Sequence, residues 1–263
     1  MNLFHSLSVS KRLRFIISSI ILLLGFSSIQ FLNEITKFTA IGLLVILTGL
    51  FSVWSFYEGL GKNMTLTSII LPMLYTLGVG IFWFLLPASI YTRIPIIIFF
   101  TVGIYVLFST MNIYTVSSSK TIALLRAARG VGFVLTLITS FLLFDAILSI
   151  RQHAIVSVPL VFVTSFLLFI QGFWSIELDK KIDKNIVLMT FVSSLILAEL
   201  SALIFFWPVT VVVGSLFLTS GVYMLLGLGQ TKLEDRLFSG AIREYLTVGL
   251  IVLVGMFFAT HWG

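Results

Sequence analysis

Long apolar stretches, separated by short polar gaps, run along almost the whole chain of 263 residues. An α-helix rises 1.5 Å per residue, so about 20 apolar residues cross the hydrocarbon core of a bilayer. Strict apolar–polar alternation is absent, and backbone groups in lipid must find partners within their own segment, so each stretch is expected to be a helix. The predicted spans are 13–32, 38–57, 65–86, 94–115, 130–150, 154–176, 185–206, 209–228 and 244–262. The pattern predicts an all-α, polytopic transmembrane helix bundle of about nine spans, with residues 1–263 as a single transmembrane domain.

The composition favours lipid as the solvent of this chain. Hydrophobic residues make up 59% of it and charged residues 10%, whereas soluble domains carry about 25% charged residues. The absence of cysteine excludes disulfides, cysteine-based zinc sites, iron–sulfur clusters and a cysteine nucleophile. The net charge of +6 does not indicate nucleic acid as a partner, because the basic residues lie in short gaps between apolar stretches.

The basic residues divide unequally between the two sides of the predicted membrane. Thirteen of the 16 lie at the N-terminus or in every second gap: Lys11, Arg12, Arg14, Lys62, Lys120, Arg126, Arg129, Lys180, Lys181, Lys184, Lys232, Arg236 and Arg243. The other side holds only Lys37, Arg93 and Arg151. By the positive-inside rule, the N-terminus is predicted to be cytoplasmic, and nine crossings leave the C-terminus outside. The short connections are typical of a protein of a prokaryotic inner (plasma) membrane.

An internal repeat is predicted from similar segments that recur about 120 residues apart. Segment 54–58 resembles 173–177, segment 81–87 resembles 204–208, and segment 101–108 resembles 219–226. These matches divide the bundle into repeat one (13–115), repeat two (130–228) and an extra helix (244–262). Four helices return the chain to its starting side, so the copies are parallel and related by an axis along the membrane normal. Residues 1–28 also resemble a cleaved signal peptide, but the repeat argues against cleavage because it makes span 13–32 the counterpart of span 130–150.

Two carboxylates, Asp145 and Glu199, fall inside predicted spans, roughly 8–10 Å below the outer boundary. A charge at this depth costs a few kcal/mol unless it is paired, hydrated or protonated. The candidate substrate- or ion-binding residues are these two acids and the basic or imidazole side chains expected on the same side: Asp145, Glu199, Arg93, Arg151, His153 and His261. The alternative is structural, with the acids paired to Arg93 or Arg151.

The gap between the two repeats predicts a contact with the membrane surface. Residues 120–129 place Ile122, Leu125 and the stems of Arg126 and Arg129 at helical spacing. This pattern is typical of a short amphipathic helix in the cytoplasmic interface, with arginine heads near anionic lipid. A solvated loop is the alternative.

The leading functional hypothesis is that the chain is a small secondary transporter or permease-like protein. This hypothesis predicts a polar cavity between the two halves that contains Asp145 or Glu199. A non-catalytic membrane scaffold or partner subunit is the alternative, and a lipid- or glycan-processing enzyme at the outer face is a third. No catalytic residue, metal site or cofactor is predicted, since the spans contain no lysine for a retinal Schiff base and the chain has no HExxH motif.

Overall fold

The computed structural model describes residues 10–56, 67–87, 89–117, 124–151, 153–178 and 182–260. Within these ranges it contains nine α-helices and no strand. The helices are α1 (Lys11–Ile29), α2 (Glu34–Phe56), α4 (Thr67–Leu85), α5 (Ile90–Ser117), α6 (Leu125–Ser149), α7 (Ala154–Glu177), α8 (Lys184–Phe205), α9 (Val211–Leu233) and α10 (Ser239–Phe258). Each is long and apolar enough to cross a membrane. The predicted all-α bundle of nine spans is confirmed, and it indicates an integral membrane protein.

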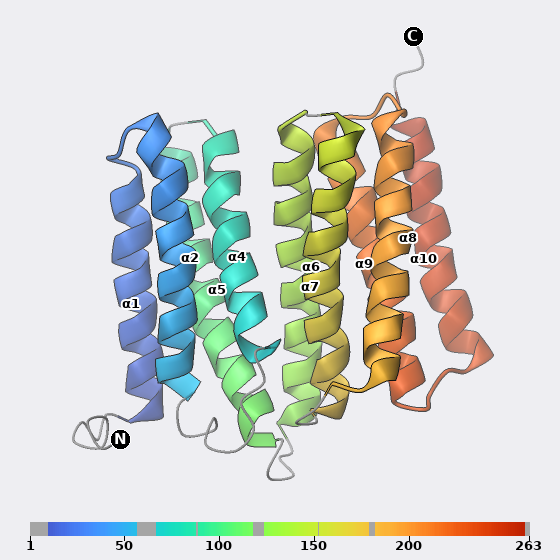
Figure 1. Ribbon diagram of the computed structural model, residues 1–263, viewed down its shortest axis with the longest axis horizontal. Coiled ribbons are helices and arrows are strands. Elements are labelled where there is room, and N and C mark those ends of the chain that lie inside the picture. The colour runs from blue at the N-terminus through green and yellow to red at the C-terminus, as the bar shows by residue number, and fades with distance from the viewer. Residues whose placement is uncertain are drawn as a thin grey trace.

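The helices stand side by side, so the bundle has two faces at which they begin and end. In Figure 1, α1 begins at the lower face and α10 ends at the upper face. The lower face is the one predicted to be cytoplasmic from the basic residues. The structure contains no membrane and leaves this orientation a prediction.

Several helices extend beyond the predicted spans at the lower face. The helices predicted to begin at 130 and 244 begin at Leu125 and Ser239, and the helix predicted to end at 228 continues to Leu233. Charged residues interrupt the apolar pattern there, but long basic side chains reach the headgroup region while their backbone stays helical. Residues 125–129 therefore form the first turns of α6 rather than a separate interfacial helix. Lys120 and Ile122 lie outside the described residues.

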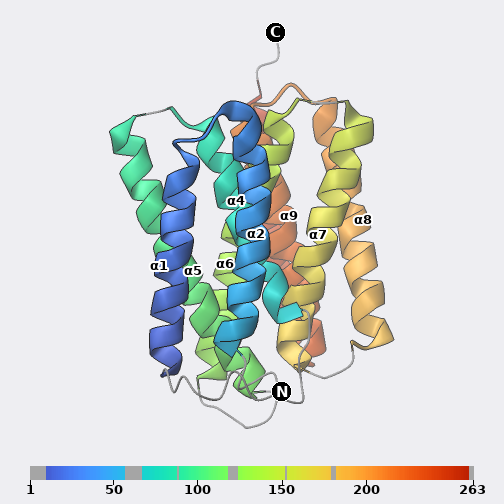
Figure 2. The same cartoon turned by 60° about the vertical axis from the view of Figure 1, so that its left-hand side comes forward.

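Helices of the same order pack in the same way in the two parts of the bundle. In the first half (α1, α2, α4 and α5), α1 packs on α2 and α5, and α4 packs on α2 and α5. In the second half (α6 to α9), α6 packs on α7 and α9, and α8 packs on α7 and α9. Figure 2 shows α4 and α6 in the middle of the bundle, where they join the halves.

The degree of burial separates the central helix from the last one. In α6, 61% of the apolar span is buried, because one side packs on the first half through Leu135 and Leu142 and another packs within the second half through Phe144 and Ile147. In α10 only 6% of the apolar span is buried, because α9 is the one helix against which α10 packs extensively. The core is therefore centred on α6, and α10 is peripheral.

Small residues and hydroxyl pairs bring the helices of the first half together. Gly103 of α5 lies against the Tyr75 side chain, where a Cβ atom would come within 2.0 Å of the tyrosine oxygen. The Tyr75 hydroxyl donates to the Phe99 carbonyl at 2.7 Å. Buried hydroxyls also pair between helices, Ser18 with Ser55 at 3.1 Å. Close packing and hydrogen bonds of this kind hold helices together in a bilayer, because the hydrophobic effect does not drive helix association in lipid.

Candidate functional site

A cavity of about 680 Å³ lies at the upper face of the second half, among the ends of α6, α7, α8 and α9. Most of its lining is apolar. Its polar side chains are Arg151, Ser157, Ser201 and Thr210, and the indole of Trp207 also borders it. A mainly apolar cavity with a few converging polar groups is the usual form of a small-molecule site. We call it the upper cavity.

The turn between α8 and α9 forms one wall of the upper cavity. Helix α8 ends at Phe205, and Pro208, which has no backbone N–H, prevents the helix from continuing. Thr210 caps α9 by accepting a hydrogen bond from the Val213 amide at 3.4 Å. The Trp207 indole N–H donates to the Thr260 hydroxyl at 2.8 Å, which ties the turn to the end of α10. The turn is thus held in place, and the positive end of the α9 dipole faces the cavity wall.

Arg151 supplies the positive charge at the cavity mouth. It follows α6 directly and is exposed, with a left-handed φ of 49°. Its amide donates to the Leu148 carbonyl at 3.2 Å, so the residue ends α6 in the conformation that glycine usually adopts at this position. No ion pair involves Arg151 within the described residues. Its guanidinium group is therefore available to a ligand.

Ser201 is a buried residue in the cavity wall. It is only 2% exposed, and its Oγ has no hydrogen-bond partner among the residues that the structure describes. On the same helix, the buried Ser194 hydroxyl bonds to the Thr190 carbonyl at 2.7 Å, whereas the Thr190 hydroxyl, like that of Ser201, has no partner among the described residues. An unsatisfied buried hydroxyl costs about 1–3 kcal/mol. A ligand or water in the cavity would remove this cost.

Asp145 lies one helical turn below the cavity floor. It is 5% exposed and accepts a hydrogen bond from the Ser215 hydroxyl at 3.2 Å, between α6 and α9. It precedes the cavity residue Leu148 by three positions, and Ser215 follows Val212 by three. In the part of the chain that the structure describes, Ser215 is its one polar side-chain partner, and neither Arg93 nor Arg151 forms an ion pair with it.

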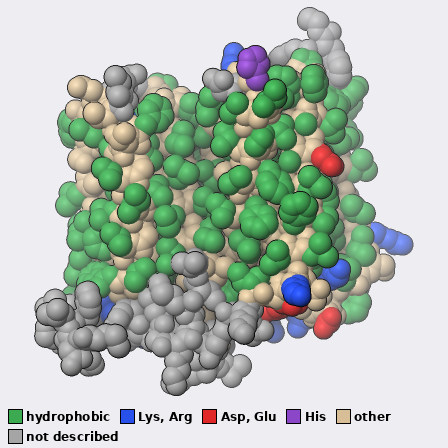
Figure 3. All heavy atoms as spheres, viewed as in Figure 1, with side chains coloured by type: hydrophobic (Ala, Val, Ile, Leu, Met, Phe, Trp, Pro, Cys, Tyr) green, Lys and Arg blue, Asp and Glu red, His purple; other side chains and the backbone are tan. Residues whose placement is uncertain are grey.

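Glu199 does not join this site. It is exposed on α8, and residues one turn away, Leu195 and Leu203, are exposed with it. Successive helical residues are 100° apart, which places Glu199 about 200° around the helix from Ser201. Figure 3 shows an acidic side chain among hydrophobic ones on the outward face of this half. The carboxylate thus points away from the upper cavity.

The remaining predicted site residues are dispersed. Arg93 belongs to the first turn of α5 in the other half, where it borders a small pocket with Trp83. His153 is exposed at the start of α7, two residues from Arg151 in the chain. His261 lies outside the described residues. The structure therefore places Arg151 at the upper cavity and Asp145 one helical turn beneath it, and leaves Arg93 and Glu199 elsewhere.

The cavity is not between the two halves, where the transporter hypothesis expects it. A groove of about 660 Å³ does lie between α4, α5 and α6, but apolar side chains such as Phe82, Phe99 and Phe141 line it, with Thr219 as the single polar one. The predicted position of the polar cavity is wrong, because the helices that meet between the two halves line this groove with aromatic and aliphatic side chains. The polar groups converge within the second half instead.

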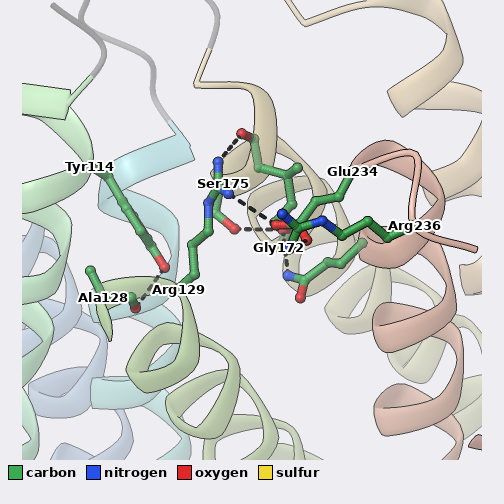
Figure 4. Close-up of polar contacts among 9 residues, drawn as sticks. Tyr114, Ala128, Arg129, Gly172, Ser175, Glu234 and Arg236 are labelled. Atoms are coloured by element: carbon green, nitrogen blue, oxygen red, sulfur yellow. Dashed lines mark hydrogen bonds and ion pairs between the residues drawn. The ribbon is translucent and has the colours of Figure 1, made fainter. Parts of the chain in front are cut away.

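A second group of polar residues joins α6, α7 and α9 at the lower face, as Figure 4 shows. The Arg129 guanidinium donates to the Glu234 carboxylate at 3.0 Å and to the Ile176 carbonyl at 2.5 Å. Arg236 lies 3.8 Å from the same carboxylate. The Gln230 amide donates to the Gly172 carbonyl at 3.0 Å. These contacts connect the ends of three helices.

Sequence reasoning missed the hydroxyls of the cavity and the Arg129–Glu234 pair. Serine and threonine occur throughout the spans, and most of them bond to their own helix. Their positions in the sequence therefore do not indicate which of them line a cavity. The two members of the ion pair are 105 residues apart. The very short gap between the predicted spans 185–206 and 209–228, which holds Trp207 and Pro208, was the one local feature that marked this end of the bundle.

One protein-family model matches residues 21–259, and its family is described as "Protein of unknown function (DUF5656)". The match reaches from α1 to the end of α10 and includes the upper cavity and the lower polar group. No curated protein and no solved structure matches the chain.

Proposed function

We propose that this chain, which belongs to the family described as "Protein of unknown function (DUF5656)", is a small secondary transporter or permease-like protein with a polar site in the upper half of the bundle. One observation carries the proposal. The upper cavity has a cation, Arg151, at its mouth and an unpartnered buried hydroxyl, Ser201, in its wall, and the buried carboxylate of Asp145 lies beneath it.

The cavity favours a small solute that carries an anionic group. The guanidinium group of Arg151 and the amino end of α9 both attract negative charge. A carboxylate or phosphate oxygen could also accept a hydrogen bond from Ser201. The volume of about 680 Å³ is in the range of small-molecule sites.

Asp145 supports coupling of this solute to a proton or cation. An ionisable group within a span is costly to keep and commonly belongs to an ion pathway. The Ser215 hydroxyl donates to the Asp145 carboxylate between α6 and α9, so a change of charge on Asp145 would alter the contact between these helices. Such a change would couple the charge on Asp145 to the wall of the cavity.

The topology proposed for the transporter follows from the repeat and the basic residues. The corresponding helix pairs of the two halves pack alike, which supports a duplication of residues 13–115 and 130–228 with 244–262 as an added helix. The excess of basic residues at the lower face supports a cytoplasmic N-terminus in a prokaryotic inner membrane, with the upper cavity open to the outside.

Proton-coupled uptake in proteoliposomes tests the proposal. Vesicles loaded with a pH-sensitive dye would receive lactate, succinate or inorganic phosphate, each separately, under an inward proton gradient. We expect at least one anion to increase internal acidification above that of protein-free vesicles. Asp145→Asn should lose this increase, whereas Glu199→Gln, which removes an acid pointing away from the cavity, should retain it.

Two results would contradict the proposal. One is an absence of anion-dependent acidification with every probe. The other is an unchanged rate in the Asp145→Asn protein. Size-exclusion profiles of both variants would show whether the bundle remains folded.

The exposed surface of α10 favours a scaffold or partner subunit as a second candidate function. Met256 is the one buried residue of this helix, and Leu250, Ile251 and Phe258 are exposed. A photo-cross-linker at Leu250 in native membranes should give a discrete protein adduct if a partner covers α10. The same cross-linker at Leu43, on the exposed side of α2, is the control, and equal labelling of lipid alone at both positions would reject this candidate.

A further inference from the structure

Three arginines surround a pocket at the lower face that the proposed transport function does not use. The pocket has a volume of about 890 Å³ and is bordered by Arg126, Arg129, Arg236 and Glu234. Leu125 and Leu233, which begin α6 and end α9, form part of its apolar border. The pocket is therefore located where two membrane spans meet the headgroup region.

The formal charges in this pocket do not balance. Glu234 is the one acid in its lining, so three guanidinium groups and one carboxylate leave a formal excess of +2. Glu234 is already shared between Arg129 at 3.0 Å and Arg236 at 3.8 Å. Arg126 is exposed and makes no ion pair within the residues that the structure describes. Two positive charges remain to be matched.

Two unsatisfied donors point to an anion as the missing partner. The Nε atom of Arg129 is buried and has no hydrogen-bond acceptor in the described part of the chain. Helix α6 begins here without a side-chain cap, so the positive end of its dipole is also unmatched at this face. Arginine, with its planar set of donors, binds phosphate in a bidentate manner.

We propose that this pocket binds the phosphate headgroup of an anionic phospholipid of the leaflet at the lower face. The apolar border would contact the glycerol and the first carbons of the acyl chains, which a free phosphate ion lacks. The leaflet predicted from the basic residues is the cytoplasmic one, where anionic lipids attract basic residues near the surface. The lipid would bridge the start of α6 and the segment after α9, in addition to the Arg129–Glu234 ion pair. This inference does not depend on the transport proposal.

Native mass spectrometry of the purified full-length protein with phosphatidylglycerol tests the lipid site. The test variant is Arg126→Gln with Arg236→Gln, which keeps Arg129 and its contacts with Glu234 and Ile176. The matched control is Arg12→Gln with Arg243→Gln, which removes the same charge from exposed positions at the same face outside the pocket. A second variant, Arg126→Gln alone, avoids any effect on the Glu234 carboxylate.

We expect the wild type and the control to retain the lipid equally. The test variant should bind it about thirtyfold more weakly, and Arg126→Gln about fivefold more weakly, since each basic residue near a membrane surface contributes about 1 kcal/mol. Equal weakening of the test and control variants would overturn the proposal, because it would show a general attraction of charge. Inorganic phosphate that displaces the lipid at equal concentration would also overturn it in favour of a site for soluble phosphate.

Discussion

The two halves of the bundle share their helix packing but differ in the polar groups that they bury. Buried hydroxyls of the first half include the pair Thr48 and Thr76 at 3.1 Å and also Ser19, which has no partner among the described residues. In the second half, the unpartnered hydroxyl of Ser201 borders the upper cavity, and the buried carboxylate of Asp145 lies beneath it. The two halves therefore differ in the cavity and the buried acid of the second half rather than in whether every hydroxyl is paired.

This difference indicates where to look for function in a membrane bundle whose halves pack alike. Packing is repeated because helices in lipid require close contact and paired polar groups. A site requires the opposite, namely polar groups that remain unsatisfied until a ligand arrives. In the second half, Ser201 carries that cost beside the upper cavity, and Arg129 forms an ion pair at the lower face.

The largest effect on stability is expected from breaking the lower ion pair of the second half. Arg129→Leu removes the hydrogen bond to Ile176 and leaves the largely buried Glu234 with only the more distant Arg236. The loss should be about 3 kcal/mol, since an uncompensated buried charge is costly. Thermal unfolding in detergent measures it, with the exposed Arg243→Leu as the control. Equal melting temperatures would show that the pair is not needed.

A smaller effect is expected in the first half at Gly103. The added Cβ of Gly103→Ala would displace the Tyr75 ring and its hydrogen bond to Phe99. We expect a loss of about 2 kcal/mol from overpacking. Gly42→Ala, where nothing lies within 4 Å of the new Cβ, should leave the melting temperature unchanged or raise it. If both substitutions have the same effect, the close approach of α4 and α5 is not as described.

The smallest effect compares one serine from each half. Ser55→Ala removes a hydroxyl that is paired with Ser18, and should destabilise the protein by about 0.6 kcal/mol. Ser201→Ala removes a hydroxyl that has no partner, so it should be neutral or slightly stabilising. Paired melting curves in the absence of added solute measure the difference. A greater loss for Ser201→Ala than for Ser55→Ala would mean that its hydroxyl is bonded within the protein.

The sequence predicted the nine helices and the position of Asp145 inside one of them, because both depend on the distribution of apolar residues along the chain. It did not predict the direction of Glu199. Helix α8 is apolar on nearly all sides, with Leu195 and Leu203 beside Glu199, so hydropathy does not define its rotation. The same reasoning began a span at residue 130, directly after Arg129, although the helix includes Arg129.

The pairing of groups distant in the chain also lay beyond sequence reasoning. The contacts of Asp145 with Ser215 and of Arg129 with Glu234 join helices whose relative depth and rotation are set by packing. A buried acid in a span signals that some partner is needed, but it does not identify one. The ends of four helices line the upper cavity, and no local sequence pattern shows that these four ends meet.

The reactivity of cysteines placed in the two halves tests most directly whether the second half alone encloses an accessible site. The chain has no cysteine, so Ser201→Cys and the equally buried Thr76→Cys, on the corresponding helix α4, each introduce a single thiol. The probe is a small, water-soluble methanethiosulfonate amine added to proteoliposomes. We predict that Ser201→Cys reacts readily through the upper cavity and that Thr76→Cys does not react. An unreactive Ser201→Cys, or equal rates at the two positions, would contradict the account.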